Sequence, residues 1–309
     1  MSWLARKETP LTDGAVWPER LREAIERHTG GRFGVERLSG MSFSGVWRVS
    51  GAAGSTIVKA SQSGYEASFY EGVASSLRRA GVPIPDLLLA LDDGTRHWLL
   101  LEDIPEPLPV ASGPDWQPDG QIVEILARLH ATTRARPPRL PNPPARNWTD
   151  AMTQSALGCL TDQGTDLEPL LATMQHEAQE LSQPWCWISG DPNPRNWGLR
   201  GGRQPVLFDW ELFGPGLPAI DLAIIVPGLG DAAAYRRVAD AYDAVWPGPD
   251  PLPWDTDQLG HQIAVAKVAT VVQLLDSHAT GRAEVGDELL DWLADSVPTW
   301  VGQIARSNH

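Results

Sequence analysis

Two polar side chains in a turn-rich segment have types and a spacing suited to proton transfer and metal binding. In WISGDPNPRNWG, residues 187–198, four residues separate Asp191 from Asn196. At this D-x-x-x-x-N spacing, phosphoryl-transfer sites hold an aspartate that accepts the proton of an attacking hydroxyl and an asparagine that ligates magnesium. Both roles need an acceptor oxygen on a rigid loop, which the prolines and asparagines favour. An Asx turn without chemistry remains an alternative.

A third acid follows at the end of an apolar strand. The segment PVLFDW places Asp209 18 residues after Asp191, where phosphoryl-transfer sites carry a second magnesium ligand. Asp221 then lies in the apolar segment PAIDLAIIV, where a carboxylate is costly unless it accepts hydrogen bonds. We therefore expect Asp221 to hold the backbone of the Asp191 loop, a role compatible with a simple helix N-cap.

The composition indicates an acidic globular protein. Its 309 residues carry a formal net charge of −14, and the length suits two domains or one two-lobed fold. Because an acidic surface repels nucleic acid and anionic membranes, we expect neither as a partner. We also predict a monomer or dimer. Two cysteines form no disulfide framework, and no stretch approaches the ~18 apolar residues of a membrane span. We expect a cytoplasmic protein.

The chain divides into a β-rich first third and a helical remainder. Residues 1–103 form the predicted N-lobe, with a hairpin in 35–51, strands at 55–60 and within 84–103, and helices at 18–28 and 65–81. The proline-rich stretch 104–120 is the predicted linker. The predicted C-lobe, 121–309, has helices at 121–135, 166–182, 229–246, 255–278 and 287–306. The strand-like runs WCWIS and PVLFDW interrupt these helices.

The motif SGDPNPRNWG, followed by LFDWELFGPGLPAIDLA, resembles the aminoglycoside phosphotransferase and choline kinase-like family. That family has the pattern HGD-x-x-x-x-N, then a D-[WF]-E strand end and a DLA helix start. LSGMSFSGVWRV resembles its nucleotide-covering hairpin, IVKA its strand lysine, YEASFYEGVASSL its helix glutamate and LLLEDI its hinge. The resemblance implies an α+β, two-lobed protein-kinase-like fold. A small antiparallel sheet with a helix would form the N-lobe, and a larger, mainly helical C-lobe would follow.

The resemblance also implies roles for individual residues. Asp191 would be the catalytic base, and Asn196 and Asp209 would ligate Mg²⁺. Lys59 would hold the phosphates of ATP or GTP and pair with Glu66. The hairpin loop and hinge would supply the other nucleotide contacts, from Gly40, Ser42, Gly45, Glu102 and Ile104. A solvated strand-end lysine remains the alternative for Lys59.

Two departures from the family pattern leave other functions open. Ser189 replaces the family's histidine, which usually buttresses the loop, and the hairpin lacks a full G-x-G-x-x-G. These departures favour a pseudokinase-like nucleotide-binding regulator without transfer activity. An unrelated metal-dependent hydrolase could use Asp191 and Asp209, but it would leave Lys59 without a role. We favour a small-molecule O-phosphotransferase.

The acceptor would be a small molecule that carries a hydroxyl group. Acid-rich segments such as DELLDWLAD could hold a cationic amine, as in an aminoglycoside or an amino alcohol. The same acids could equally form a solvated helix face. His130, on the segment LARLHA, is expected to pack beneath the Asp191 loop as a structural residue.

Overall fold

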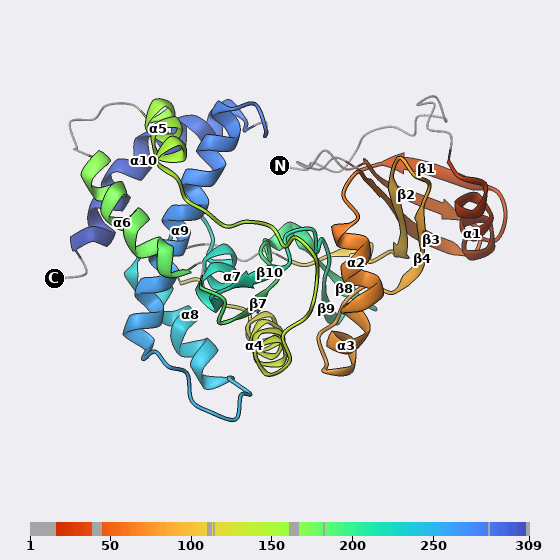
Figure 1. The fold of residues 1–309 in the computed structure, drawn as a ribbon, viewed down its shortest axis with the longest axis horizontal. Helices are drawn as coiled ribbons and strands as arrows, with labels where there is room; N and C mark the ends of the chain where they lie inside the picture. The colour runs from red at the N-terminus through yellow and green to blue at the C-terminus, as the bar shows by residue number, and fades with distance from the viewer. Residues whose placement is uncertain are drawn as a thin grey trace.

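The computed structural model has two lobes, a small one with a β-sheet and a larger helical one (Figure 1). It describes residues 17–38, 45–109, 113, 115–160, 167–181, 183–283 and 285–306. The α+β, two-lobed arrangement expected from the sequence is confirmed.

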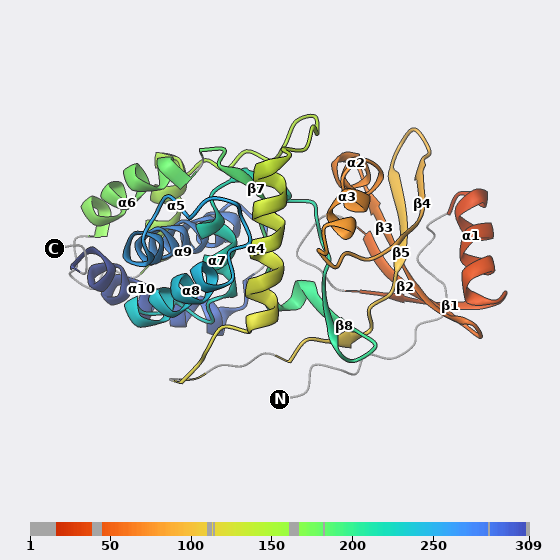
Figure 2. The same cartoon turned by 90° about the horizontal axis from the view of Figure 1, so that it is seen from below.

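The N-lobe contains a five-stranded antiparallel sheet in the order β1-β2-β3-β5-β4. The strands are β1 (Phe33–Arg37), β2 (Gly45–Gly51), β3 (Gly54–Ser61), β4 (Leu87–Asp92) and β5 (His97–Glu102). Helix α1 (Glu19–Thr29) covers the outer face, and α2 (Tyr65–Gly72) and α3 (Ala74–Arg79) lie on the face toward the helical lobe (Figure 2). The sheet is therefore covered on both faces.

Strand alternation explains which side chains meet which helices. Successive side chains of a strand point to opposite faces. Trp98 and Leu100 of β5 belong to the apolar cluster with α1, whereas Leu99 and Leu101 belong to the cluster with α2, α3 and the helical lobe. On β3, Val58 likewise packs in the α1 cluster, so that the next residue along the strand faces α2.

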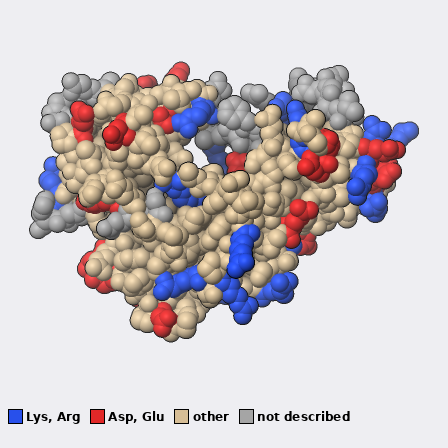
Figure 3. Space-filling view, viewed as in Figure 1, with Lys and Arg blue, Asp and Glu red and all other residues tan. Residues whose placement is uncertain are grey.

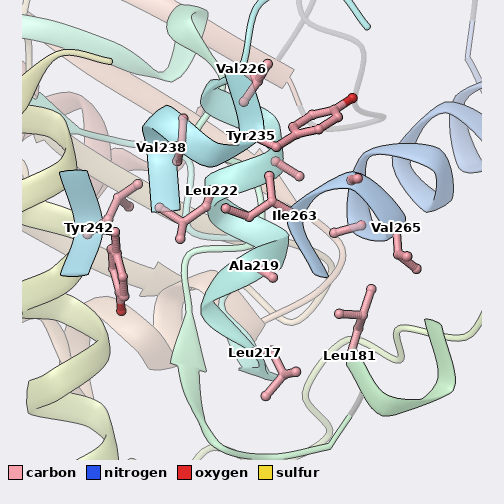
Figure 4. Close-up of a cluster of buried hydrophobic side chains, with 14 of the residues drawn as sticks. Leu181, Leu217, Ala219, Leu222, Val226, Tyr235, Val238, Tyr242, Ile263 and Val265 are labelled. Atoms are coloured by element: carbon pink, nitrogen blue, oxygen red, sulfur yellow. The ribbon is translucent and has the colours of Figure 1, made fainter. Parts of the chain in front are cut away.

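The helical lobe is built around one short, largely buried helix. Its helices are α4 (Gly120–Ala135), α5 (Asp150–Cys159), α6 (Leu167–Leu181), α7 (Pro218–Ile225), α8 (Ala232–Ala244), α9 (Thr256–Ala279) and α10 (Asp287–Arg306). Ala219 and Leu222 of α7 lie between side chains of α8 and α9 (Figure 4). In the described parts of the chain, no helix is both long and apolar enough to cross a membrane.

Five short strands and one 3₁₀ turn hold the loops between the lobes. They are β6 (Glu106–Pro107), β7 (Cys186–Ile188), η1 (Pro194–Asn196), β8 (Trp197–Arg200), β9 (Gln204–Leu207) and β10 (Gly214–Gly216). β6, β8 and β9 form one antiparallel sheet, and β7 pairs with β10. The Asp191 loop lies between β7 and η1, and Asp209 follows β9.

The structure differs from the sequence-based element prediction in three places. The helix expected over 65–81 is broken at Val73, which has φ −117°. Gly72 precedes the break, and glycine has a low helix propensity. The linker 104–120 contributes β6, which pairs with the helical lobe. The sequence analysis did not predict α5, β8 or β10, and the family's DLA pattern indicated only the start of α7. Helix α7 lacks an amphipathic pattern because each of its residues is buried or half-buried.

Candidate active site

Lys59 and Glu66 meet as the sequence analysis predicted, and Asp209 joins them. β3 pairs with both neighbours through Lys59, which is 8% exposed and faces α2. The Lys59 Nζ atom lies 2.6 and 2.8 Å from the Glu66 carboxylate oxygens and 2.9 Å from Asp209 Oδ1. Burial alone would lower the Lys59 pKa, but the two carboxylates raise it above its ordinary value. The lysine therefore remains charged.

Asp221 holds the backbone of the Asp191 loop, as expected. This fully buried carboxylate, in the first turn of α7, accepts the N–H groups of Ser189 and Gly190, each at 2.8 Å. His130 of α4 lies 3.0 Å from the same carboxylate through Nε2, and its Nδ1 lies 3.0 Å from the Tyr242 hydroxyl. The hydrogen bonds satisfy the buried charge, so the loop is tied to two helices of the lobe.

Asp191 and Asn196 lie side by side at the tip of this loop. The Asn196 Nδ2 atom donates to the Asp191 carbonyl at 2.9 Å and to its Oδ2 at 3.0 Å, and Asn193 donates to Oδ2 at 2.8 Å. Burial raises the Asp191 pKa and nearby Asp209 raises it further, while the two amide donors oppose the shift. The Asp191 carboxylate is thus a stronger proton acceptor than a solvated one.

The backbone brings Asp209 beside this loop. Phe208 donates its N–H to the Asn196 carbonyl at 3.0 Å, which joins the two segments directly. Asp209 adopts a φ of +68°, a left-handed conformation that non-glycine residues adopt at a cost. The next N–H, of Trp210, donates to Glu66 at 3.1 Å, and the Trp210 indole is fully buried. The contacts at residues 208 and 210 hold the strained residue between them.

The sequence analysis missed Glu211, which completes a cluster of acids. Oxygens of Glu66, Asp209 and Glu211 all lie within 4.8 Å of one another. Burial and the nearby Asp209 charge raise the pKa of Glu211 to about 7. Three carboxylates beside one lysine are an oxygen donor set that suits a hard cation such as Mg²⁺. The family's D-[WF]-E pattern contains this glutamate, but its spacing alone does not place the side chain, because Asp209 is left-handed and residues 209–211 are not an extended strand.

The predicted nucleotide contacts of the hairpin are only partly described. Gly40 and Ser42 lie outside the described residues. Gly45 begins β2 opposite Ala60, and a Cβ atom there would collide with the Trp47 indole. The packing of Trp47 accounts for this glycine without a ligand.

The two predicted hinge residues both contact the helical lobe. The Glu102 carboxylate accepts a hydrogen bond from Arg200 Nε at 2.8 Å and another from the Asp86 N–H at 3.0 Å. The Ile104 side chain packs closely against Gly198 of β8. Arg200 therefore engages the Glu102 side chain, and the Glu102 N–H donates to the Asp86 carbonyl at 2.9 Å.

Residues 34–254 of the chain match APH, the phosphotransferase enzyme family. The chain belongs to this family. The expected resemblance is confirmed, and the aligned segment includes Lys59, Asp191 and Asp209. A comparison with curated proteins finds no match.

Solved structures of phosphotransferases have a fold similar to that of this chain. A candidate aminoglycoside phosphotransferase from Ralstonia eutropha is 16% identical, with a TM-score of 0.62 over 94% of this chain and 98% of that chain. A spectinomycin phosphotransferase, in complex with ADP and spectinomycin, is 12% identical, with a TM-score of 0.57 over 94% and 98%. An amicoumacin kinase, in complex with AMP-PNP, Ca²⁺ and Ami, is 14% identical, with a TM-score of 0.55 over 94% of each chain. These likenesses show a kinase-like fold.

Among the described residues, the helical lobe contains cavities that lie apart from the predicted site residues. One cavity, of about 380 Å³, is lined mainly by residues of α6 and α9. Another, of about 620 Å³, is lined mainly by residues of α8, α9 and α10. Neither lining includes a predicted site residue. In the space-filling view, the molecule is hollowed between the two lobes (Figure 3).

Proposed function

We propose that the protein is a magnesium- and nucleoside-triphosphate-dependent phosphotransferase that moves the γ-phosphate of ATP or GTP to a hydroxyl of a small molecule. The observation that carries this proposal is the three-way contact of Lys59, Glu66 and Asp209 beside the Asp191 loop. This contact joins a cation of the N-lobe to an acid of the helical lobe. A hydrolase using only the two aspartates would have no need of it.

Asp191 is the base in this proposal. Its raised pKa and its position at the loop tip suit it to accept the proton of the acceptor hydroxyl as the oxygen–phosphorus bond forms. The bond between the γ-phosphorus and the bridging oxygen breaks, and the nucleoside diphosphate leaves. Asn193 and Asn196 orient the carboxylate, so that catalysis depends on positioning more than on covalent chemistry.

Asn196, Asp209 and Glu211 would hold Mg²⁺, and Lys59 would bind the phosphates. When bound, the metal neutralises charge on the transferred phosphoryl group. Glu66 keeps the lysine oriented and charged. The acceptors to test first are aminoglycosides and amino alcohols, because the chain is strongly acidic.

The test is nucleoside-diphosphate release with Mg²⁺ and ATP or GTP, over a panel of aminoglycosides, amino alcohols, macrolides and sugars. We expect turnover with one acceptor class. Asp191→Asn should lower kcat at least 100-fold, the scale of a lost general base. Lys59→Met should lower kcat/KM strongly because the phosphates lose their cation.

Lys267→Met is the matched control for the Lys59 variant. Lys267 of α9 is also 8% exposed, but its ammonium donates to the Ala223 and Val226 carbonyls at the end of α7 and not to a carboxylate of the site. Once circular dichroism shows that its fold is intact, this variant should retain turnover, because the Lys267 ammonium binds no phosphate in this proposal. Activity that survives Lys59→Met would favour a hydrolase, and nucleotide binding without turnover on any acceptor would favour a regulator.

A further inference from the structure

Tyr65 joins the first residue of α2 to the loop that carries the metal-binding acids. Its hydroxyl donates to the Phe213 carbonyl at 2.6 Å. The next helix residue, Glu66, accepts the Trp210 N–H at 3.1 Å. Two consecutive residues of one helix end therefore bind two backbone groups of the loop Asp209–Gly214. Burial raises the pKa of Tyr65 to about 12, so the hydroxyl stays a donor at neutral pH.

Arg146 holds the same loop from the other lobe. Its Nη2 atom donates to the Leu212 carbonyl, immediately before the carbonyl that Tyr65 binds. The guanidinium also fills the space that a Cβ of Gly190 would need, and Gly190 has φ +88°. Arg146 therefore contacts both the acid-bearing loop and the residue before Asp191. Neighbouring carbonyls of the loop are fixed by residues from different lobes.

The loop needs such restraint because its acids repel one another. Glu66, Asp209 and Glu211 present oxygens within 4.8 Å. Among the described residues, Lys59 is the one lysine that contacts this group, and it binds Glu66 and Asp209. Asp209 also keeps its left-handed backbone conformation. Repulsion and strain both favour a relaxed loop with its carboxylates farther apart. Restraint beyond the acids is required to keep a metal site assembled.

Stacked rings extend the contact of α2 with this loop. The Phe69 ring stacks on Trp210 with centroids 4.6 Å apart and packs against Phe213 at 4.9 Å. These rings pack the helix against the loop, but ring contacts alone do not fix the direction of a backbone carbonyl. The Tyr65 hydroxyl supplies that direction.

Resting on the function proposed above, we propose that Tyr65 and Arg146 are positioning residues that lock the acid-bearing loop between the lobes, so that Asp209 and Glu211 are preorganised for a divalent cation. Neither residue needs to touch the phosphates or the acceptor. Because Tyr65 belongs to α2, the metal site is assembled only when α2 packs against the loop.

Tyr70 provides a matched control for Tyr65. It lies in the same helix, is 2% exposed, and its hydroxyl has no hydrogen-bond partner among the described residues. Tyr65→Phe and Tyr70→Phe each remove one hydroxyl from α2, but only the first removes a bond to the loop. A general effect on helix stability would be shared by both variants.

The deciding measurement is amide hydrogen exchange in the protein without metal, nucleotide or acceptor. The reporters are the Trp210 N–H, which binds Glu66, and the Phe213 N–H, which binds the Trp210 carbonyl at 3.1 Å. In Tyr65→Phe both should exchange about fivefold faster, the effect of losing one neutral hydrogen bond. Tyr70→Phe, which removes a buried hydroxyl without a partner, should exchange no faster than the wild type. Unchanged exchange in Tyr65→Phe would overturn the proposal.

A second measurement separates positioning from a purely structural role. In Tyr65→Phe, the Mg²⁺ concentration for half-maximal turnover should rise severalfold, while the acceptor KM stays within twofold. Arg146→Lys, which keeps a donor, should need less Mg²⁺ than Arg146→Met. An unchanged Mg²⁺ requirement in both Tyr65→Phe and Arg146→Met would overturn the proposal. A wild type without turnover would contradict the proposed function, and the exchange result would still decide the role of Tyr65.

Discussion

Ser189 shows how the backbone of a loop can be held without the side chain expected at that position. The family's histidine is absent, yet the Ser189 N–H still donates to Asp221, and His130 of α4 reaches the same carboxylate. The Ser189 hydroxyl is buried and has no hydrogen-bond partner in the described part of the chain. The loop is thus fastened through its main chain, and the hydroxyl contributes nothing to it.

We therefore expect Ser189→Ala to leave the protein as stable as the wild type or more stable by about 1 kcal/mol. A buried hydroxyl without a partner loses its hydration and gains nothing in return, at a cost of about 1–3 kcal/mol. Urea unfolding should report the change, with kcat within twofold of the wild type. A loss of stability or a large fall in kcat would show that the hydroxyl supports the loop.

At the scale of an element, α7 is anchored at both ends by buried charges. Asp221 in its first turn binds the Asp191 loop, and the Lys267 ammonium of α9 donates to the Ala223 and Val226 carbonyls at 3.1 and 2.7 Å. A cation at a helix C-terminus satisfies carbonyls that have no partner within the helix. Burial lowers the pKa of Lys267 to about 8. The short helix therefore depends on a lysine that is costly to keep charged.

This lysine predicts a pH dependence of stability. Between about pH 8 and the ordinary lysine value of 10.5, the unfolded chain binds a proton that the folded protein lacks. The free energy of unfolding of the wild type, relative to Lys267→Met, should therefore rise over this range, by roughly 3 kcal/mol at most at 1.36 kcal/mol per pKa unit. Below pH 8 the difference should be constant. Denaturant unfolding of both proteins at several pH values measures it, and a flat difference across the whole range would contradict the assignment.

At the scale of the whole molecule, one apolar core crosses between the lobes. Side chains of α2, α3 and β5 cluster with the helical lobe, whereas α1 and the outer sheet face form a smaller cluster of their own. Arg200 of β8 adds an ion pair to Glu102 of the hinge. On the face shown in Figure 3, acidic and basic side chains are interspersed. The lobes are joined by burial of apolar surface as well as by a linker.

Thermal unfolding should therefore occur in a single transition. Separating the lobes would expose the shared core, which is costly at about 25 cal/mol per Å² of apolar surface. Scanning calorimetry should give equal calorimetric and van't Hoff enthalpies. The fragment 1–103 should not fold alone, as measured by circular dichroism. Two resolved transitions, or a folded fragment, would contradict this prediction.

The elements that the sequence predicted are those with a local pattern. The strand 55–60 is rich in β-branched residues, the segment 84–103 has two apolar runs around an LDDGT turn, and the helices of the second half have a 3.6-residue period. All of them could be located without knowledge of their neighbours. Helix α7 and the short strand β10 could not be located in this way. Their conformation follows from burial by the rest of the lobe, because neither has a local period that distinguishes it.

For the site, the sequence by itself determined which side chains could do the chemistry. The motif around Asp191 and Asn196, the acid after β9 and the lone lysine of β3 could all be recognised from residue type and spacing. Only the tertiary structure decided that Glu211 joins the acids and that Tyr65 binds the loop across 148 positions of sequence. The physical reason is that such contacts arise from the packing of one lobe on the other, which no local pattern encodes.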